Sequence, residues 1–229
     1  MNDFNNKISD LFKDAEKDNI AYSKLENILD KILDGEKNKE DVYLFLDLLH
    51  LSSVSKVIAK NNNSGYWTSK IAYIVEKYNF HTGQLLRQRI QRYKEKTLFI
   101  NIDGENKEAI TYNKFGNDLI LASKAIDSLS DNNTITVGIL SFNQYKSALI
   151  DLCCLAFGIR IIPIPLNSTS DHISYILEEA EITHLFIGGD KSAQLWNSIN
   201  KIHNIKIIDI NNIGSIKGKT ISWDDFQDL

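Results

Sequence analysis

"GIRIIPIPLNSTSDHISYILEEAE", residues 158–181, contains both prolines of the chain, one residue apart and next to a β-branched run. Pro163 and Pro165 have no amide donor, so they belong at a sheet edge or at the end of a strand. Residues 159–164 are apolar except for Arg160 and the first proline, which suits a strand covered on both faces of a parallel sheet. We therefore expect a buried strand that stops at the prolines.

The residues after the prolines predict a helix. Hydroxyl groups at Ser168, Thr169 and Ser170 can cap its N-terminus, and Asp171 lies where the helix dipole favours a carboxylate. Its apolar side chains recur at helical spacing, at Ile173, Ile176 and Leu177. The stretch is therefore one strand-to-helix step.

The same step recurs on both sides of this stretch. Three further runs predict strands: Thr134–Leu140, His184–Ile187 and Ile205–Ile210. Ser141 stands three residues before Gln144, the arrangement of a capping box, and the helix that it opens should end at Gly158. Successive steps of this kind predict an α/β fold with a doubly wound, mostly parallel sheet.

The chain before residue 79 predicts an all-α prefix. Apolar residues recur every three or four positions from Ile20 to Leu33 and stop at Gly35, which we interpret as a helix C-cap. A second stripe runs from Val42 to Val54 and breaks at residues 61–65, and a third helix is expected over Ser69–Tyr78. We divide the chain into a helical N-terminal extension, residues 1–78, and an α/β part, residues 79–229.

The α/β part begins with a helix through Leu85 and Tyr93, followed by two short strands. Thr97–Ile102 and Ala109–Tyr112 flank Asp103-Gly104, which predicts a β-hairpin or two nearby strands. These elements precede the repeated strand-to-helix steps.

Composition excludes several classes of protein. Hydrophobic residues make up 43% and charged residues 24%, as in globular domains. The net charge of −4 argues against binding to a nucleic-acid backbone. No secretory leader or transmembrane segment is recognisable. Cys153 and Cys154 are adjacent, a spacing that rarely reaches disulfide geometry, so we expect a reducing cytoplasm and no metal site at these thiols.

Several segments, in order, resemble a known family. Ile110–Phe115 (ITYNKF), Asp151–Leu166 and Asn167–Leu177 resemble segments of the adenylate-forming (AMP-binding) synthetases, and most of all the long-chain fatty acyl-CoA ligases. Lys114 stands where the family usually has an acidic residue. The resemblance covers residues 80–229, and in the family these segments mark structure rather than catalysis.

The resemblance implies a function for a longer parent protein. Such an enzyme would activate a long-chain fatty acid with ATP and Mg²⁺ and pass the acyl-adenylate to coenzyme A. The family's phosphate loop, its adenine-binding segments and its C-terminal lysine have no counterpart before Leu229. We therefore expect the N-terminal subdomain of the AMP-binding domain, truncated before the phosphate loop: inactive alone, with no cofactor and no assigned catalytic, cofactor-binding or metal-binding residue.

The best local candidate for phosphate binding is Gly188-Gly189-Asp190-Lys191-Ser192. It lacks the first spaced glycine of a P-loop, and Asp190 would repel phosphate. We interpret it as an ordinary strand-to-helix turn.

Other chemistry-bearing residues also favour structural interpretations. Cys153 is expected in the core, His172 beside Asp171 at the surface, and Tyr175 in packing. The tryptophans Trp67, Trp196 and Trp223 are scattered and show no base-stacking pattern. A basic cluster suggests a solvated helix face rather than a site for nucleic acid or an anionic membrane: Arg87, Arg89, Arg92, Lys94 and Lys96.

Alternatives and partners stay open at this point. The chain can also be a stand-alone, non-catalytic α/β scaffold or interaction protein, or part of an aryl or amino-acid adenylating enzyme. The first expected partner is the remainder of the same polypeptide. A homo-oligomer would cover an unpaired sheet edge, and so would the helical prefix if it folded over that edge. The prefix is either a packing cap or a partner-docking module, and peripheral membrane contact of the parent stays open.

Overall fold

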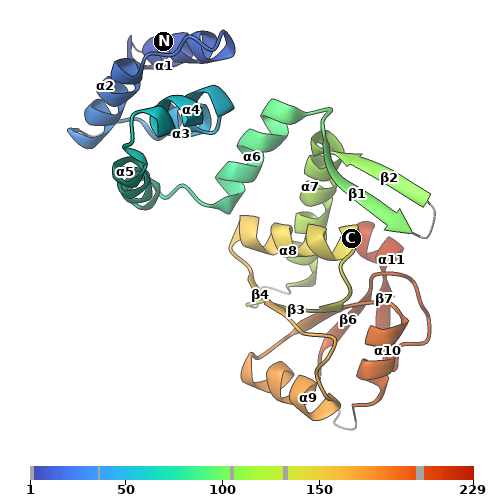
Figure 1. Ribbon diagram of the computed structural model, residues 1–229. Helices are drawn as coiled ribbons and strands as arrows, with labels where there is room; N and C mark the ends of the chain where they lie inside the picture. The colour runs from blue at the N-terminus through green and yellow to red at the C-terminus, as the bar shows by residue number, and fades with distance from the viewer. Residues whose placement is uncertain (1–2, 36, 104–105, 131–133, 200–203) are drawn as a thin grey trace. The chain divides into compact units, whose positions relative to one another are not determined.

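The computed structural model describes residues 3–35, 37–103, 106–130, 134–199 and 204–229. The chain forms two compact units, Met1–Gln88 and Arg89–Leu229 (Figure 1). The boundary between the two units falls within helix α6 (Thr82–Tyr93), whereas the sequence analysis places it after residue 78.

The first unit is helical. Its elements before α6 are α1 (Asp3–Glu16), α2 (Tyr22–Leu33), α3 (Lys39–Leu49), α4 (Ser52–Lys60) and α5 (Ser64–Lys77). Their apolar stripes meet in one core, where Phe45 and Trp67 are the largest fully buried side chains. The indole N–H of Trp67 donates to the Tyr22 hydroxyl at 3.1 Å, so α5 is joined to α2 by a hydrogen bond as well as by burial.

Several helix boundaries in the first unit differ from the prediction. Helix α1 was not predicted, although its buried residues Phe4, Ile8, Leu11 and Ala15 recur at helical spacing. The stripe from Val42 to Val54 is two helices, α3 and α4, with a bend of 77° between them. Helix α2 ends at Leu33 with Asp34 in right-handed helical geometry as its C-cap, so Gly35 is not the cap. Helix α5 begins at Ser64, one turn earlier than Ser69.

Within the described residues, no single helix has the length and apolarity needed to cross a membrane. The bent pair α3 and α4 meets the length and hydropathy criterion only when its two helices are taken together.

The second unit begins with the expected hairpin. Strands β1 (Thr97–Asp103) and β2 (Asn106–Thr111) pair antiparallel, and Gly104 of the expected turn lies outside the described residues. Strand β2 leads directly into helix α7 (Tyr112–Leu129), whose N-cap is Thr111. Phe99 holds the hairpin on the rest of the unit, with ring centroids 5.8 Å from Phe115 and 5.7 Å from Tyr145.

A five-stranded parallel sheet follows, in the order β4-β3-β5-β6-β7. The strands are β3 (Thr136–Ser141), β4 (Arg160–Pro163), β5 (His184–Gly188), β6 (Lys206–Asp209) and β7 (Thr220–Ser222). The helices between and after them are α8 (Tyr145–Phe157), α9 (Ser170–Glu179), α10 (Asp190–Asn197) and α11 (Trp223–Gln227). Figure 1 shows α9 and α10 on one face of the sheet and α8 and α11 on the other, which confirms the predicted doubly wound α/β fold.

Both faces of the sheet are packed. On the face of α9 and α10, Leu185 lies in one apolar cluster with Leu177 and Trp196. On the opposite face, Phe186 meets Phe226 of α11 edge-on, with ring centroids 5.3 Å apart. Strands β3 and β5 are buried along almost their whole length because they are central.

The proline strand is an edge strand. Strand β4 ends at Pro163 as expected, but its residues are half-buried or exposed, so the prediction that both of its faces are covered is wrong. The amide of Ile164 still donates to the carbonyl of Ile139 at 2.8 Å. Because alternate residues of a strand point their amides in opposite directions, the two prolines fall on the side away from β3.

The expected helix ends are mostly confirmed. Thr169 caps α9 by accepting the amide of His172 at 3.3 Å, and Gly158 ends α8 in the left-handed conformation with φ +71°. The start of α8 is a correction. Gln144 itself is the N-cap and forms the capping box with Ser147, so the helix begins one turn after the expected cap at Ser141.

Candidate functional site

The strand order reverses beside β3. The chain leaves β3 for β4 on one side and then returns to β5 on the other side of β3. In open parallel sheets, ligands bind outside the carboxyl ends of the strands at such a reversal. In this sheet those ends are Ser141 on β3 and Gly188 on β5, which are register partners. We therefore take this edge of the sheet as the candidate site.

Two glycines allow the loops at this edge to approach each other. A Cβ atom on Gly188 would collide with Ser141 Oγ and Gln144 Nε2. A Cβ on Gly189 would lie 2.6 Å from the Phe142 ring, and Gly189 also has φ +88°, a conformation that suits glycine. The loop after β3 thus lies directly on the loop after β5.

An amide pair joins this edge to the next strand. Gln144 Nε2 donates to Asn211 Oδ1 at 3.0 Å, and Asn211 Nδ2 donates to Gln144 Oε1 at 3.0 Å. Gln144 Nε2 also donates to Ser141 Oγ at 2.9 Å. The side-chain amides therefore connect the carboxyl ends of β3 and β6 and fix the first turn of α8.

Lys146 lies beside the amide pair. Its ammonium donates to the carbonyl of Ile210 at 2.9 Å and lies 4.9 Å from the centre of the Trp223 ring. Burial lowers the pKa of Lys146, whereas the carboxylates of Asp224 and Asp209 act in the opposite direction. The site thus contains a partly desolvated cation held by a carbonyl and an aromatic face.

A cavity of about 370 Å³ opens between this edge and the β1–β2 hairpin. Its lining includes Lys146, Asn211, Phe142, Trp223 and Ile102. Cations, amides and aromatic rings in one hollow suit a ligand that carries both a polar group and an apolar part.

A second polar group lines the same cavity. The Tyr145 hydroxyl donates to Asp118 Oδ2 at 2.6 Å, and the Lys114 ammonium donates to the same oxygen at 2.8 Å. Burial and the bonded carboxylate of Asp118 raise the pKa of Tyr145, so its phenol stays protonated. Lys114, which departs from the family pattern, thus neutralises a carboxylate on its own helix.

The Gly188–Ser192 turn takes part in packing rather than in a phosphate cradle. Gly189 is the N-cap of α10, and the Ser192 hydroxyl donates back to the carbonyl of Gly188 at 2.7 Å. The Phe142 ring lies against Gly189. Within the described part of the chain, no three His, Cys, Asp or Glu side chains are grouped to hold a metal ion.

Apart from Trp223, the other sequence candidates do not line this cavity. Cys153 is fully buried as expected, and burial raises its pKa to about 12. Asp171 and His172 are exposed as expected, whereas Tyr175 is 61% exposed, so its predicted packing role is wrong. In the basic cluster, Lys96 lies 4.9 Å from the Tyr93 ring centre. The three tryptophans are buried: Trp67, Trp196 and Trp223.

Sequence reasoning did not assign several residues to the site, among them Lys146, Asn211 and Trp223. Asn211 follows the expected strand Ile205–Ile210 directly, so its position at a carboxyl end was a usable signal. Lys146 and Trp223 gave no such signal, because one lies in the first turn of a helix and the other starts a helix far along the chain.

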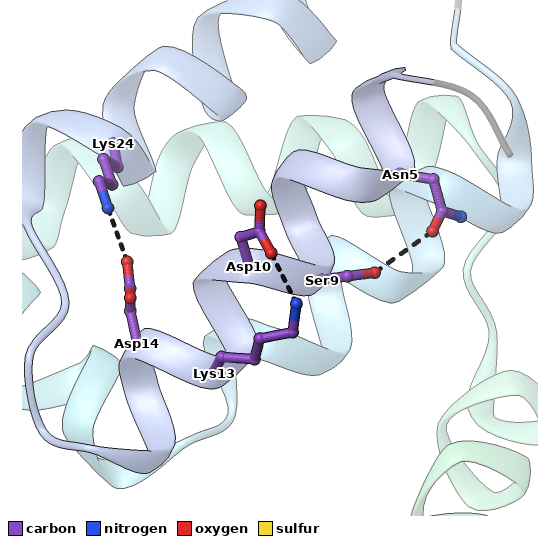
Figure 2. A network of polar contacts seen from close by, with 6 residues as sticks. All are labelled: Asn5, Ser9, Asp10, Lys13, Asp14 and Lys24. Atoms are coloured by element: carbon purple, nitrogen blue, oxygen red, sulfur yellow. Dashed lines mark hydrogen bonds and ion pairs between the residues drawn. The ribbon is translucent and has the colours of Figure 1, made fainter.

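The first unit has a hollow of its own, of about 420 Å³, between α1 and α2. Figure 2 shows that both lining aspartates are paired: Asp14 with Lys24, which also lines the hollow, at 2.7 Å, and Asp10 with Lys13 of the same helix at 2.8 Å. Ion pairs near the surface add little stability.

Comparison with known proteins relates the fold to one group of enzymes. No protein-family model and no curated protein matches the sequence. Among solved structures, similar chains include a putative long-chain-fatty-acid CoA ligase from Rhodopseudomonas palustris, with a TM-score of 0.54, 14% identity and coverage of 64% of this chain and 36% of that one. Coronafacic acid ligase from Pectobacterium brasiliense has a TM-score of 0.52 and 14% identity, over 65% of this chain and 29% of that one. A fatty acyl CoA synthetase from Mycobacterium tuberculosis has a TM-score of 0.50 and 16% identity, over 65% of this chain and 27% of that one.

The chain thus spans only about a quarter to a third of the length of these structures. A structural similarity at such low sequence identity establishes the fold alone and not the reaction. This chain has part of the fold of the adenylate-forming enzymes.

Proposed function

We propose that this chain is the N-terminal part of an adenylate-forming ligase whose substrate is a long-chain fatty acid. The complete enzyme would couple ATP to activation of the carboxylate and then transfer the acyl group to coenzyme A. The observation that carries the proposal is the parallel sheet with its order β4-β3-β5-β6-β7, on a chain similar in fold to acyl-CoA ligases.

The described residues do not fit ATP and Mg²⁺ as a complete site. The best turn for phosphate has Asp190 in its first helical position, and its Ser192 hydroxyl already donates to a carbonyl. No acidic cluster suited to a metal ion occurs in the described ranges. We therefore assign this chain a supporting role, in which the carboxyl edge of the sheet forms one wall of a site completed by other parts of the enzyme.

The decisive experiment is ATP–pyrophosphate exchange by the complete product of the gene, with a panel of fatty, aryl and amino acids. Exchange stimulated most by long-chain fatty acids would support the proposal. Exchange stimulated most by aryl or amino acids would support an adenylate-forming reaction but contradict a fatty-acid substrate. Absence of exchange with every acid would contradict the reaction itself.

A matched measurement uses residues 1–229 alone. We expect titration calorimetry to detect no ATP binding and exchange assays to detect no turnover. Tight ATP binding by this chain alone would overturn the supporting role.

The rival function is a stand-alone scaffold or interaction protein. Reading the coding DNA beyond codon 229 distinguishes the two: a Thr/Ser/Gly-rich run ending in Pro-Lys supports the ligase, whereas a stop codon supports the rival. Cytoplasmic location is part of the same proposal, since Cys153 and Cys154 are both free thiols.

A further inference from the structure

Two lysines line the cavity at the carboxyl edge of the sheet, and their surroundings differ. Lys114 on α7 is paired with Asp118, with 2.8 Å between Nζ and Oδ2, and it is exposed. Lys146 on α8 is half-buried, and its Nζ donates to a backbone carbonyl, that of Ile210. The cavity thus holds one lysine bonded to a carboxylate and one bonded to a neutral group.

The carboxylates that act on Lys146 are engaged by other donors. Asp209 accepts two backbone amides of the loop after β6, at 3.2 and 3.0 Å. Asp224 Oδ2 accepts Asn212 Nδ2 at 3.0 Å. Burial outweighs the attraction of these two carboxylates, and the pKa of Lys146 is lowered. A lowered pKa increases the fraction of molecules in which this lysine is a neutral amine.

A neutral Lys146 keeps its anchor and gains a nucleophile. An amine can donate one N–H to the Ile210 carbonyl while the lone pair on its nitrogen stays available. Lysines that are desolvated beside apolar groups act as nucleophiles toward carbonyl carbon. The contact with Ile210 therefore positions the nitrogen without consuming its reactive electron pair.

The same cavity offers apolar surface beside the amine. Its lining includes Ile102, Phe142, Leu149 and Trp223. An alkyl chain gains free energy when such surface covers it, which leaves its carbonyl end to the polar groups of the cavity. The arrangement suits an acyl group whose carbonyl carbon is open to attack.

We propose that Lys146 is a modification site that takes an acyl group from an acyl thioester. The amine nitrogen attacks the thioester carbonyl carbon, a C–N bond forms, and the C–S bond breaks. The thiolate leaves and takes up the proton that the amine loses, so the products are an amide and a free thiol. Acylation turns a basic side chain into a neutral amide that fills part of the cavity.

The inference rests on the proposed function for the source of the thioester, because acyl-coenzyme A would be the product of that enzyme. The reactivity of the amine does not depend on that function, since it follows from burial and from the contact with Ile210.

The test is incubation of residues 1–229 with octanoyl-CoA at about pH 8, followed by mass spectrometry of peptides over time. We expect Lys146 to be acylated at least about threefold faster than Lys114, although Lys114 is the more exposed of the two. In urea both side chains are solvated, so the two rates should converge.

Variants assign the fast reaction to one residue. Lys146→Arg keeps the charge and should remove the fast reaction. Lys124→Arg is the matched control, at an exposed lysine of α7, and should leave it unchanged. The preference for octanoyl-CoA over acetyl-CoA should be greater at Lys146 than at Lys124, because the apolar lining holds the longer chain.

Acylation of Lys146 at or below the rate of Lys114, or a fast reaction that survives Lys146→Arg, would overturn the proposal. An equal chain-length preference at Lys146 and Lys124 would contradict the role of the cavity. ATP–pyrophosphate exchange by the complete enzyme is a separate readout. Selective acylation without exchange would support the reactive amine and remove the enzyme as its thioester source, whereas exchange without selective acylation would overturn the modification site alone.

Discussion

Gln144 and Asn211 exchange two hydrogen bonds of 3.0 Å although they lie 67 positions apart in the chain. Gln144 is the N-cap of α8, and Asn211 follows β6. The pair closes the carboxyl edge of the sheet over β5, which lies between β3 and β6. The candidate site therefore forms only when β3, β5, β6 and α8 have all folded and packed together.

We predict that Asn211→Ala lowers the free energy of unfolding by about 1 kcal/mol, since Gln144 keeps its bond to Ser141 and stays partly satisfied. Urea denaturation of Asn211→Ala, Gln144→Ala and the double variant measures the coupling. The double variant should cost less than the sum of the single variants. Strict additivity would show that the two amides do not stabilise each other.

Gly189→Ala should destabilise the chain by about 2 to 3 kcal/mol, because alanine disfavours φ +88° and its Cβ meets the Phe142 ring. In the double variant with Phe142→Ala, the stability lost through the collision with the ring should be recovered. The loss caused by the unfavourable φ at position 189 should remain. Gly65→Ala is the control: it has open space around it within helix α5, so thermal unfolding should show unchanged or raised stability. Equal losses at both glycines would contradict this account.

The two buried thiols should make the fold sensitive to alkaline pH. Burial raises the pKa of Cys153 to about 12 and raises the pKa of Cys154 further. Above about pH 9 the unfolded thiols lose protons that the folded ones retain, so stability falls as pH rises, by up to about 1.4 kcal/mol per pH unit for each thiol.

Urea midpoints from pH 7 to 10.5 measure this effect, and Cys153→Ala should reduce the slope. Thiol labelling at pH 8 should be slow for the folded chain and fast in urea. Rapid labelling without urea would show that the thiols are accessible.

Tyr145→Phe removes a hydroxyl that donates to Asp118 Oδ2 at 2.6 Å. Because Lys114 still pairs with Asp118, we expect a loss of about 1 to 2 kcal/mol rather than the full cost of an isolated buried carboxylate. Tyr175→Phe, at an exposed tyrosine, should change the unfolding midpoint little. Similar losses in the two variants would argue that the hydrogen bond to Asp118 contributes nothing specific.

Local patterns were sufficient to predict most elements of the α/β unit. Each strand from β1 to β6 was found within a few residues because its apolar run is bounded by glycine, proline or polar residues, as at Gly158 and Pro163, whereas the short strand β7 (Thr220–Ser222) was not predicted. The doubly wound arrangement followed from the alternation of strands and helices.

The errors arose where distant parts of the chain decide the outcome. The run before Pro163 looks fully buried, yet the strand lies at an edge, since strand order depends on how far each crossover reaches. The break between α3 and α4 falls at His50 and Leu51, inside an unbroken apolar stripe. The site itself joins the start of α8, with Gln144 and Lys146, to Asn211, and this contact spans 67 positions of the chain, so local spacing does not predict it.

The outer edge of strand β4 affects how readily the sheet can pair with a strand of a neighbouring molecule. Two of the positions whose amide would point away from β3, Pro163 and Pro165, have no N–H to offer an incoming strand, while the amide of Ile164 is engaged with β3. At the C-terminal end of β4, a neighbouring strand would therefore find carbonyl acceptors but no amide donors. The two prolines thus disfavour edge-to-edge pairing with another molecule along this part of the sheet.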